Sequence, residues 1–119
     1  MQAVCETKRP SAATARANCL WVSKLGDRIV GRIGLVQAAP QVARLCQFRV
    51  DPEWQHTSIP KNLVGCLQAY CWCQGALKIV AEASDVPAWF RELLNRGGFR
   101  MSAQRMVAGR MQYEFRVKQ

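Results

Sequence analysis

The residues from Phe48 to Leu63 combine the types and spacing that best suit the binding of a charged ligand. An apolar run ends at Asp51-Pro52, because proline cannot donate to a β-ladder. A helix signal follows at Ser58, with Pro60 suited to an early helical position. The start of a helix presents free backbone N–H groups and favours a bound anion. The sequence therefore predicts a site for a phosphate-bearing ligand at residues 55 to 62.

The six cysteines do not form a pattern that predicts a metal site. Zinc sites usually pair two Cys-x2–4-Cys modules, whereas Cys71 and Cys73 have one residue between them. In a helix that spacing points the two thiols to nearly opposite sides. We expect Cys66, Cys71 and Cys73 to be core cysteines. Cys46 lacks a recognisable histidine partner for nucleophilic chemistry.

The elements that must position the anion site follow from hydrophobic periodicity. Alternating or short apolar runs predict strands over 19–25, 28–37, 42–50, 78–83, 99–107 and 111–118. Helical spacing predicts one helix over 61–76, with its start signal at Ser58, and a second that Pro87 opens and Gly97-Gly98 ends. A strand, a helix and a strand in sequence form a crossover, so 42–50 and 78–83 are expected to be parallel.

The predicted order is β-β-β-α-β-α-β-β, which makes an α/β (α+β) fold with a mixed twisted sheet. The length of 119 residues suits one domain over 19–119. Residues 1–18 carry little periodicity and are expected to be an N-terminal arm or a short helix over Ser11 to Ala17.

Lysine and arginine outnumber the acidic residues by 17 to 8, which gives a net charge of +9. Such a surplus indicates either an anionic partner or a solvated basic surface. The arginines are spread through the chain without a nucleic-acid-binding motif, which disfavours nucleic acid but leaves a nonspecific phosphate patch open. No run reaches the ~20 apolar residues of a membrane-spanning helix. Residues 1–16 show no apolar signal segment, so we expect no membrane association and a cytoplasmic, basic protein with reduced thiols.

From about Cys19 to Val117 the chain resembles the GNAT superfamily of acetyl-CoA-dependent N-acetyltransferases. The resemblance rests on four segments in order, which are GDRIVGRIGL, LCQFRVDPEWQ, the loop Gln55–Pro60 and WFRELLNRGGF. It implies an acyl-CoA N-acyltransferase-like fold and a single GNAT-like domain over 19–119. It also implies acetyl-CoA or CoA as the cofactor, and acetyl transfer to an amine by direct attack.

The resemblance assigns roles to seven residues at the cofactor site. The backbone of Phe48 and Val50 would face pantetheine. Gln55 would order the loop that precedes the helix. Backbone donors of the loop and the first helical turn would face the diphosphate, namely Thr57, Ser58, Ile59 and Lys61.

The sequence departs from the family pattern at the diphosphate loop and at the general acid. Ser58 and Pro60 replace the two small residues of the loop, and Pro60 has no N–H to donate. The tyrosine that many members use as general acid corresponds to Leu94, which cannot donate a proton. The nearby proton-transfer candidates are Asp51, Glu53, His56 and Glu82. Glu82 is the best of them, with an ion pair to an arginine as its alternative role.

The chain is also short for the family, because residues 1–18 cannot supply the usual N-terminal strand and two helices. This leaves the acceptor groove open or completed by a second chain, so a homodimer is one expectation. The acceptor is expected to be an amine. The sequence leaves two functions open, an N-acetyltransferase and a catalytically inactive GNAT-like binding or regulatory module with a basic surface.

Overall fold

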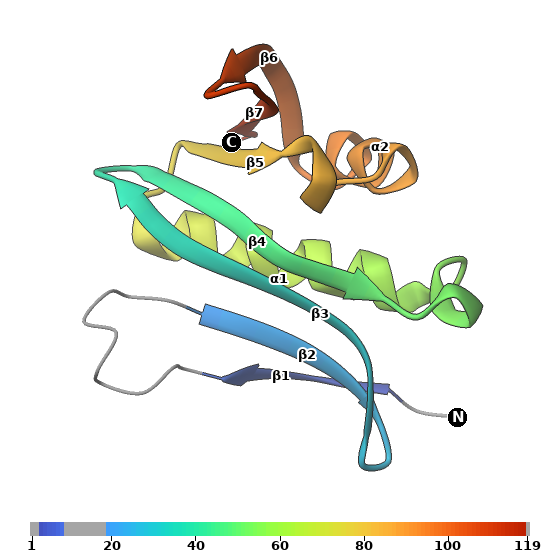
Figure 1. The fold of residues 1–119 in the computed structure, drawn as a ribbon. Helices are drawn as coiled ribbons and strands as arrows, with labels where there is room; N and C mark the ends of the chain where they lie inside the picture. Colours follow the sequence, from blue (N-terminus) through green and yellow to red (C-terminus); the bar gives the residue numbers. More distant parts are fainter. Residues whose placement is uncertain (1–2, 9–18, 119) are drawn as a thin grey trace.

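The computed structural model describes residues 3–8 and 19–118 (Figure 1). Seven strands are present in the described residues, and two α-helices and two short 3-10 turns join them. The strands are β1 (Ala3–Lys8), β2 (Cys19–Leu25), β3 (Arg28–Ala39), β4 (Val42–Val50), β5 (Lys78–Glu82), β6 (Phe99–Val107) and β7 (Arg110–Val117). The helices are α1 (Ser58–Gln74) and α2 (Ala88–Arg96), and the 3-10 turns are η2 (Pro52–Trp54) and η3 (Ala83–Asp85).

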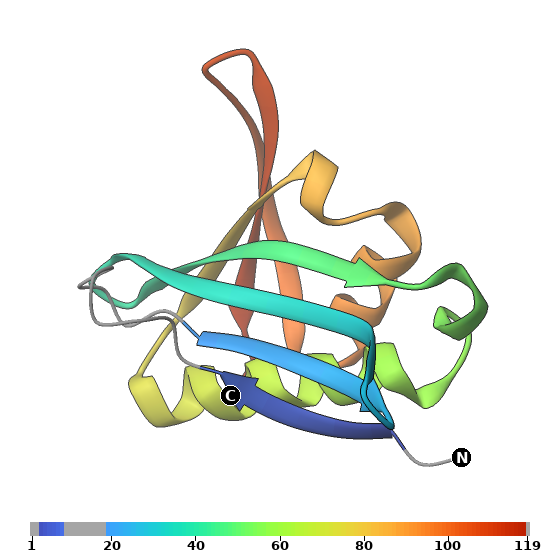
Figure 2. The same ribbon diagram turned by 60° about the horizontal axis from the view of Figure 1, so that its bottom comes forward.

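All seven strands belong to one sheet, in the order β1-β2-β3-β4-β5-β7-β6. The β4–β5 pair is parallel and the other pairs are antiparallel. Parallel pairing follows from the crossover through α1. The β6–β7 hairpin extends beyond the rest of the sheet (Figure 2).

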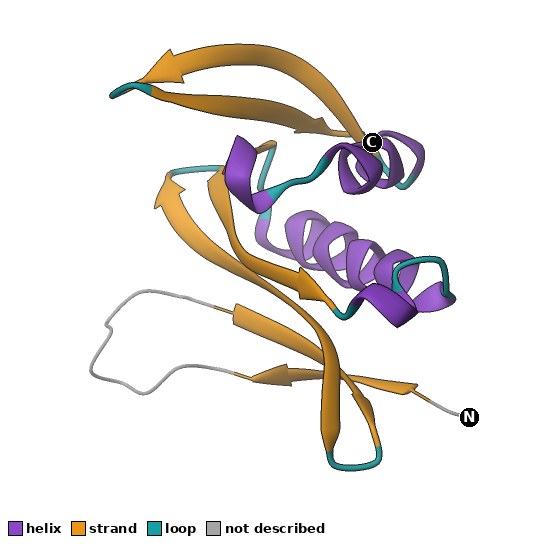
Figure 3. Cartoon of the chain, turned by 45° about the vertical axis from the view of Figure 1, so that its right-hand side comes forward, coloured by secondary structure: helices purple, strands orange, loops and turns teal. Residues whose placement is uncertain are grey.

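Both helices pack on the same face of the sheet and share one core with it (Figure 3). The largest fully buried side chains include Phe90 and Leu94 of α2, Leu63 and Leu67 of α1, and Phe115 of β7. The side chains that alternate with the core positions of β2 to β5 therefore form a second sheet face, which we call the open face.

The predicted order of strands and helices is confirmed over residues 19–117, and the mixed α+β class with it. The structure differs at the N-terminal end, where Ala3–Lys8 pairs with β2 as an additional strand instead of forming an arm or a helix. The helix expected over residues 11–17 lies outside the described residues. No helix in the described ranges is both long and apolar enough to cross a membrane.

Candidate functional site

The first feature of the site is a free strand edge in the middle of the sheet. The parallel pairing of β4 with β5 is confined to three residue pairs, from Val42↔Lys78 to Arg44↔Val80. Beyond Arg44 the two strands diverge, and the stretch from Leu45 to Val50 has no partner on β5. Its backbone N–H and C=O groups on that edge can pair with an extended ligand that carries amides.

A β-bulge lies on this free stretch. Between the pairs Gly34↔Cys46 and Arg32↔Arg49, β4 contains one residue more than β3. Gln47 takes up the extra length with φ +54°, a conformation that residues other than glycine seldom adopt. Arg32 Nε donates to the Gln47 carbonyl at 3.3 Å, which fixes the bulge against β3. The bulge re-aims the backbone of β4 at the point where β5 leaves it.

The start of α1 lies directly after β4 and offers few free amides. An α-helix leaves its first N–H groups without an intrahelical acceptor. Here the Ile59 amide donates to the capping Thr57 hydroxyl at 3.3 Å, the Thr57 amide donates to the Trp54 carbonyl at 3.2 Å, and Pro60 has no N–H. The Ser58 amide is left for a ligand. The side chain of Lys61 is exposed one turn into the helix and adds a positive charge.

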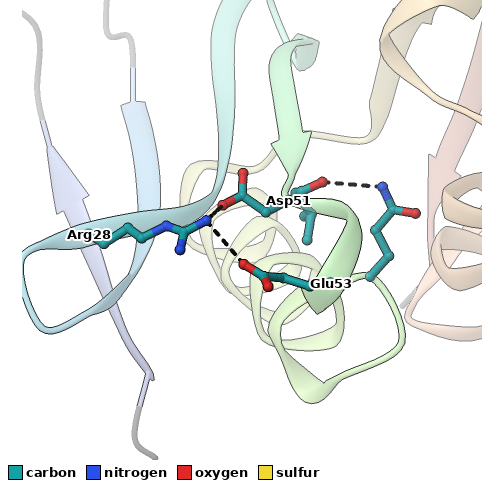
Figure 4. Close-up of polar contacts among 5 residues, drawn as sticks. Arg28, Asp51 and Glu53 are labelled. Carbon is teal, nitrogen blue, oxygen red and sulfur yellow. Dashed lines mark hydrogen bonds and ion pairs between the residues drawn. The ribbon is translucent and has the colours of Figure 1, made fainter.

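Polar contacts hold the loop between β4 and α1 in place (Figure 4). The side-chain amide of Gln55 donates to the Val50 carbonyl at 3.2 Å, so Gln55 ties the loop to the end of the strand. Arg28, the first residue of β3, forms ion pairs with Asp51 at 2.9 Å and with Glu53 at 3.0 Å. Two of the four acid–base candidates are therefore engaged in holding this loop.

A groove of about 390 Å³ runs from the start of α1 along α2. Its walls combine Val64 and Gly65 of α1 with Leu93 of α2, and its charged lining groups are Lys61 and Arg96. Among the described residues, the indole N–H of Trp54 in the η2 turn before α1 is buried without a hydrogen-bond partner. We call this space the α1–α2 groove.

Aromatic rings join β4 to α2 beside the free edge. The rings of Phe48 and Phe90 stack with centroids 3.7 Å apart and planes 13° apart. Trp89 packs on both rings, at 5.7 Å from Phe48 and 5.8 Å from Phe90. This cluster fixes the distance between the free edge and α2, and it leaves the backbone of Phe48 as the part available to a ligand.

The acid–base groups of the site gather on the open face where β4 and β5 separate. Glu82 forms an ion pair with Arg110 at 3.4 Å, which is the alternative role that the sequence allowed for it. Asp85 of η3 is half-buried, and η3 contacts β4. Burial and the neighbouring Glu82 carboxylate raise the pKa of Asp85, and Arg44 partly opposes them. A raised carboxyl pKa is typical of a general base.

The thiol of Cys46 lies close enough to Asp85 to sense its charge. Burial, and then Asp85, raise the pKa of Cys46, while Arg44 lowers it. A thiol with a raised pKa stays protonated and is a poor nucleophile at neutral pH. Leu94, at the position of the family's tyrosine, is fully buried in the core. His56 is exposed in the loop.

The structure thus brings together the predicted residues at the end of β4 and the start of α1. Asp51 and Glu53 both form ion pairs with Arg28. Three features were missed from the sequence, namely Asp85, the bulge at Gln47 and Arg96 in the groove. In the described part of the chain, no group of three His, Cys, Asp or Glu side chains is placed to hold a metal ion.

The free edge and the helix start suit a long anionic ligand with amide groups, such as CoA. The edge can pair with the pantetheine amides, and Lys61, Arg96 and the Ser58 amide can face phosphates. The fit is weakest at the diphosphate, because Pro60 and the Thr57 cap remove two amide donors. When bound as acetyl-CoA, this cofactor supplies an acetyl group activated as a thioester.

Comparison with solved structures shows the same fold in known acetyltransferases. The IAA acetyltransferase from Bacillus cereus ATCC 14579 is 16% identical with a TM-score of 0.72, over 99% of this chain and 100% of that chain. The Bacillus subtilis acetyltransferase in complex with CoA is 14% identical with a TM-score of 0.71, over 99% of both chains. An acetyltransferase of the GNAT family from Staphylococcus aureus Mu50 is 19% identical with a TM-score of 0.68, over 88% of this chain and 71% of that chain.

A search among curated proteins found no match. The family model "Acetyltransferase (GNAT) family" matches residues 3–91, which include the free strand edge, the loop and α1. The matched region covers most of the chain and agrees with the fold of the solved relatives. The chain belongs to the GNAT acetyltransferase family.

Proposed function

We propose that this chain binds acetyl-CoA between β4 and β5 and transfers its acetyl group to an amine. The observation that carries the proposal is the free edge of β4 from Leu45 to Val50, next to the positively charged start of α1. A central strand with an unpaired edge is costly unless a ligand or a covering element satisfies its backbone groups.

The binding residues follow from this placement. The backbone of Phe48 and Val50 would pair with pantetheine, with Gln55 holding the Val50 carbonyl in position. The Ser58 amide and the Lys61 ammonium would hold the diphosphate. Thr57 and Ile59 would contribute through the cap that fixes the first helical turn, since their own hydrogen bond is already made. Arg96 would meet a more distant anionic part of the cofactor in the α1–α2 groove.

Asp85 would act as the general base in place of Glu82. Its carboxylate would accept the proton that the amine loses as its nitrogen attacks. Glu82 would raise the proton affinity of Asp85 without touching the amine, because Glu82 itself is paired with Arg110. Backbone N–H groups on the free edge of β4 would stabilise the negative charge on the reacting oxygen.

A second candidate function is a binding module that holds CoA without turnover. The buried Leu94 favours it, because no phenol is available there to protonate a leaving thiolate. The two candidates share the cofactor site and differ in turnover.

A calorimetric titration with acetyl-CoA and with CoA tests the shared part. We expect saturable binding with one site per chain. Release of CoA in the presence of primary amines then separates the enzyme from the binding module. An absence of heat and of any thermal shift at millimolar ligand would exclude both candidates.

A charge placed at the start of α1 tests the position of the cofactor. Ser58→Glu puts a carboxylate beside the diphosphate, and we expect at least a tenfold loss of affinity. Gln74→Glu adds the same charge at the other end of α1 and is the matched control. Unchanged affinity in Ser58→Glu would show that the diphosphate lies elsewhere.

A further inference from the structure

A second concave site, of about 340 Å³, lies over β2, β3 and β4. Its lining includes Leu20, Val22, Ile29, Arg32, Arg49 and Asp51. Val22 and Arg32 alternate with the core residues Trp21 and Ile33, so this site opens on the face of the sheet away from α1. We call it the open-face pocket.

Two arginines face each other in this pocket. Arg32 and Arg49 are directly opposite in the β3–β4 register, and both are exposed. Like charges directly opposite each other destabilise a strand pair. Among the described side chains no carboxylate forms an ion pair with Arg32 or Arg49. The one acid in the lining, Asp51, is paired with Arg28 at 2.9 Å. Within the part of the chain whose side chains are described, the pocket therefore has two positive charges without a counter-ion.

The rest of the lining is largely apolar, and the β4 bulge lies between this pocket and Asp85, the proposed base. Leu20 and Val22 form apolar lining, and Ile29 beside them is 44% exposed. Arg32, which lines the pocket, also donates to the carbonyl of Gln47 in the β4 bulge, so the pocket and the bulge are in direct contact. Arg49 follows that bulge by two residues, and Asp85 lies on its other side, near Cys46. An amine placed at Asp85 would extend across the bulge toward the two arginines.

We propose that the open-face pocket binds the carboxylate of the acceptor, and that the acceptor is an amine with a carboxylate next to an apolar group. This inference rests on the proposed acetyl transfer. Two neighbouring guanidinium groups suit a planar carboxylate, which each of them can bind through two N–H groups. The apolar lining suits a hydrophobic side chain on the same molecule. A hydrophobic amino acid carries all three groups.

Ligand binding measured without CoA tests the pocket independently of turnover. The probes are N-acetyl-L-phenylalanine, a product of the proposed class, and its amide, which differs only in the missing carboxylate charge. The arginine Nε signals in nitrogen-15 NMR spectra are the readout. We expect the acid to shift the Arg32 and Arg49 signals and to bind at least tenfold more tightly than the amide. Equal binding of the two probes, or binding of neither, would overturn the inference.

Variants and a second anion complete the test. Arg49→Gln and the double variant Arg32→Gln/Arg49→Gln should lose the preference for the acid, while Arg100→Gln, an exposed arginine on β6, should keep it. Thermal unfolding of each variant checks that it folds. Tighter binding of inorganic phosphate than of the acid at the same signals would contradict a carboxylate site. Acetyl-CoA calorimetry is separate, so its failure would refute the transferase and leave the anion pocket standing.

Discussion

At the scale of single residues, the proposed acetyl transfer depends on Asp85 more than on any acid that the sequence singled out. Its carboxylate is half-buried, and burial together with Glu82 raises its pKa. We predict that Asp85→Asn lowers kcat by about 100-fold, since an amide cannot accept the proton. The Kd for acetyl-CoA, measured by calorimetry, should stay the same. A variant with unchanged kcat would remove Asp85 from the mechanism.

The pH dependence of the rate gives a second prediction about Asp85. Asp85 accepts a proton only when it is deprotonated, so activity should fall as the pH drops through its raised pKa. Glu82→Gln removes one cause of the raised pKa, so the acidic limb of the pH–rate profile should move to lower pH.

Arg110→Gln is the opposing control for this shift. It leaves the Glu82 carboxylate without its ion pair at 3.4 Å, so the acidic limb should move to higher pH or stay in place. A shift in the same direction in both variants would show that Glu82 does not act through Asp85.

Why Asp85 was missed can be explained in physical terms. In the sequence Ser84-Asp85 looks like a polar linker between a strand and a helix. Its proximity to Cys46 arises only after β5 pairs with β4 and the η3 turn folds back on it. The bulge at Gln47 is equally silent, because glutamine carries no signal for a positive φ. Such contacts depend on register, which a single sequence does not encode locally.

At the scale of elements, the sequence was most informative where one face of a segment is buried. The strict alternation of Tyr113, Phe115 and Val117 predicted β7, and these three side chains are buried. The signals at Ser58 and Pro60 predicted the start of α1, which begins at Ser58. The strand Ala3–Lys8 was missed, because six residues without strong alternation give little signal and its order comes from pairing with β2.

The start of α1 leads to a prediction in which a substitution strengthens the binding of acetyl-CoA. Pro60→Ala adds one amide N–H in the first turn of the helix. We expect acetyl-CoA to bind about fivefold more tightly, which corresponds to ~1 kcal/mol for one added hydrogen bond. Stability should fall by about 0.4–1 kcal/mol, because alanine increases the entropy of the unfolded chain.

Pro87→Ala makes the same replacement before α2, where Pro87 is exposed. This control should leave the calorimetric affinity for acetyl-CoA unchanged. Equal affinities of Pro60→Ala and the parent protein would show that the first turn of α1 does not contact the diphosphate.

At the scale of the whole molecule, the basic surplus and the two sites are related but separable. The net charge of +9 attracts any polyanion over a long range, and this attraction weakens as salt screens it. Lys61 would contribute a local contact with the diphosphate in addition to the general field. Arg116 is an exposed arginine on β7 and pairs with Lys78 in the sheet. Lys78 is the first residue of β5, which follows the C-terminal end of α1. Lys61 therefore lies near the start of α1 and Arg116 lies beyond its other end, and this helix of 17 residues is roughly 25 Å long.

Charge reversal at Lys61 and at Arg116 separates the effect of the overall positive charge from that of a direct contact with the cofactor. Lys61→Glu and Arg116→Glu each lower the net charge by two. At about 0.05 M salt both should weaken acetyl-CoA binding in calorimetry, because both reduce the field of the protein. At about 0.5 M salt the Debye length falls to roughly 4 Å, so Arg116→Glu should bind like the parent protein. Lys61→Glu should remain at least fivefold weaker, because its carboxylate would lie within contact distance of the diphosphate. Equal affinities of the two variants at high salt would mean that the basic surface alone attracts the cofactor.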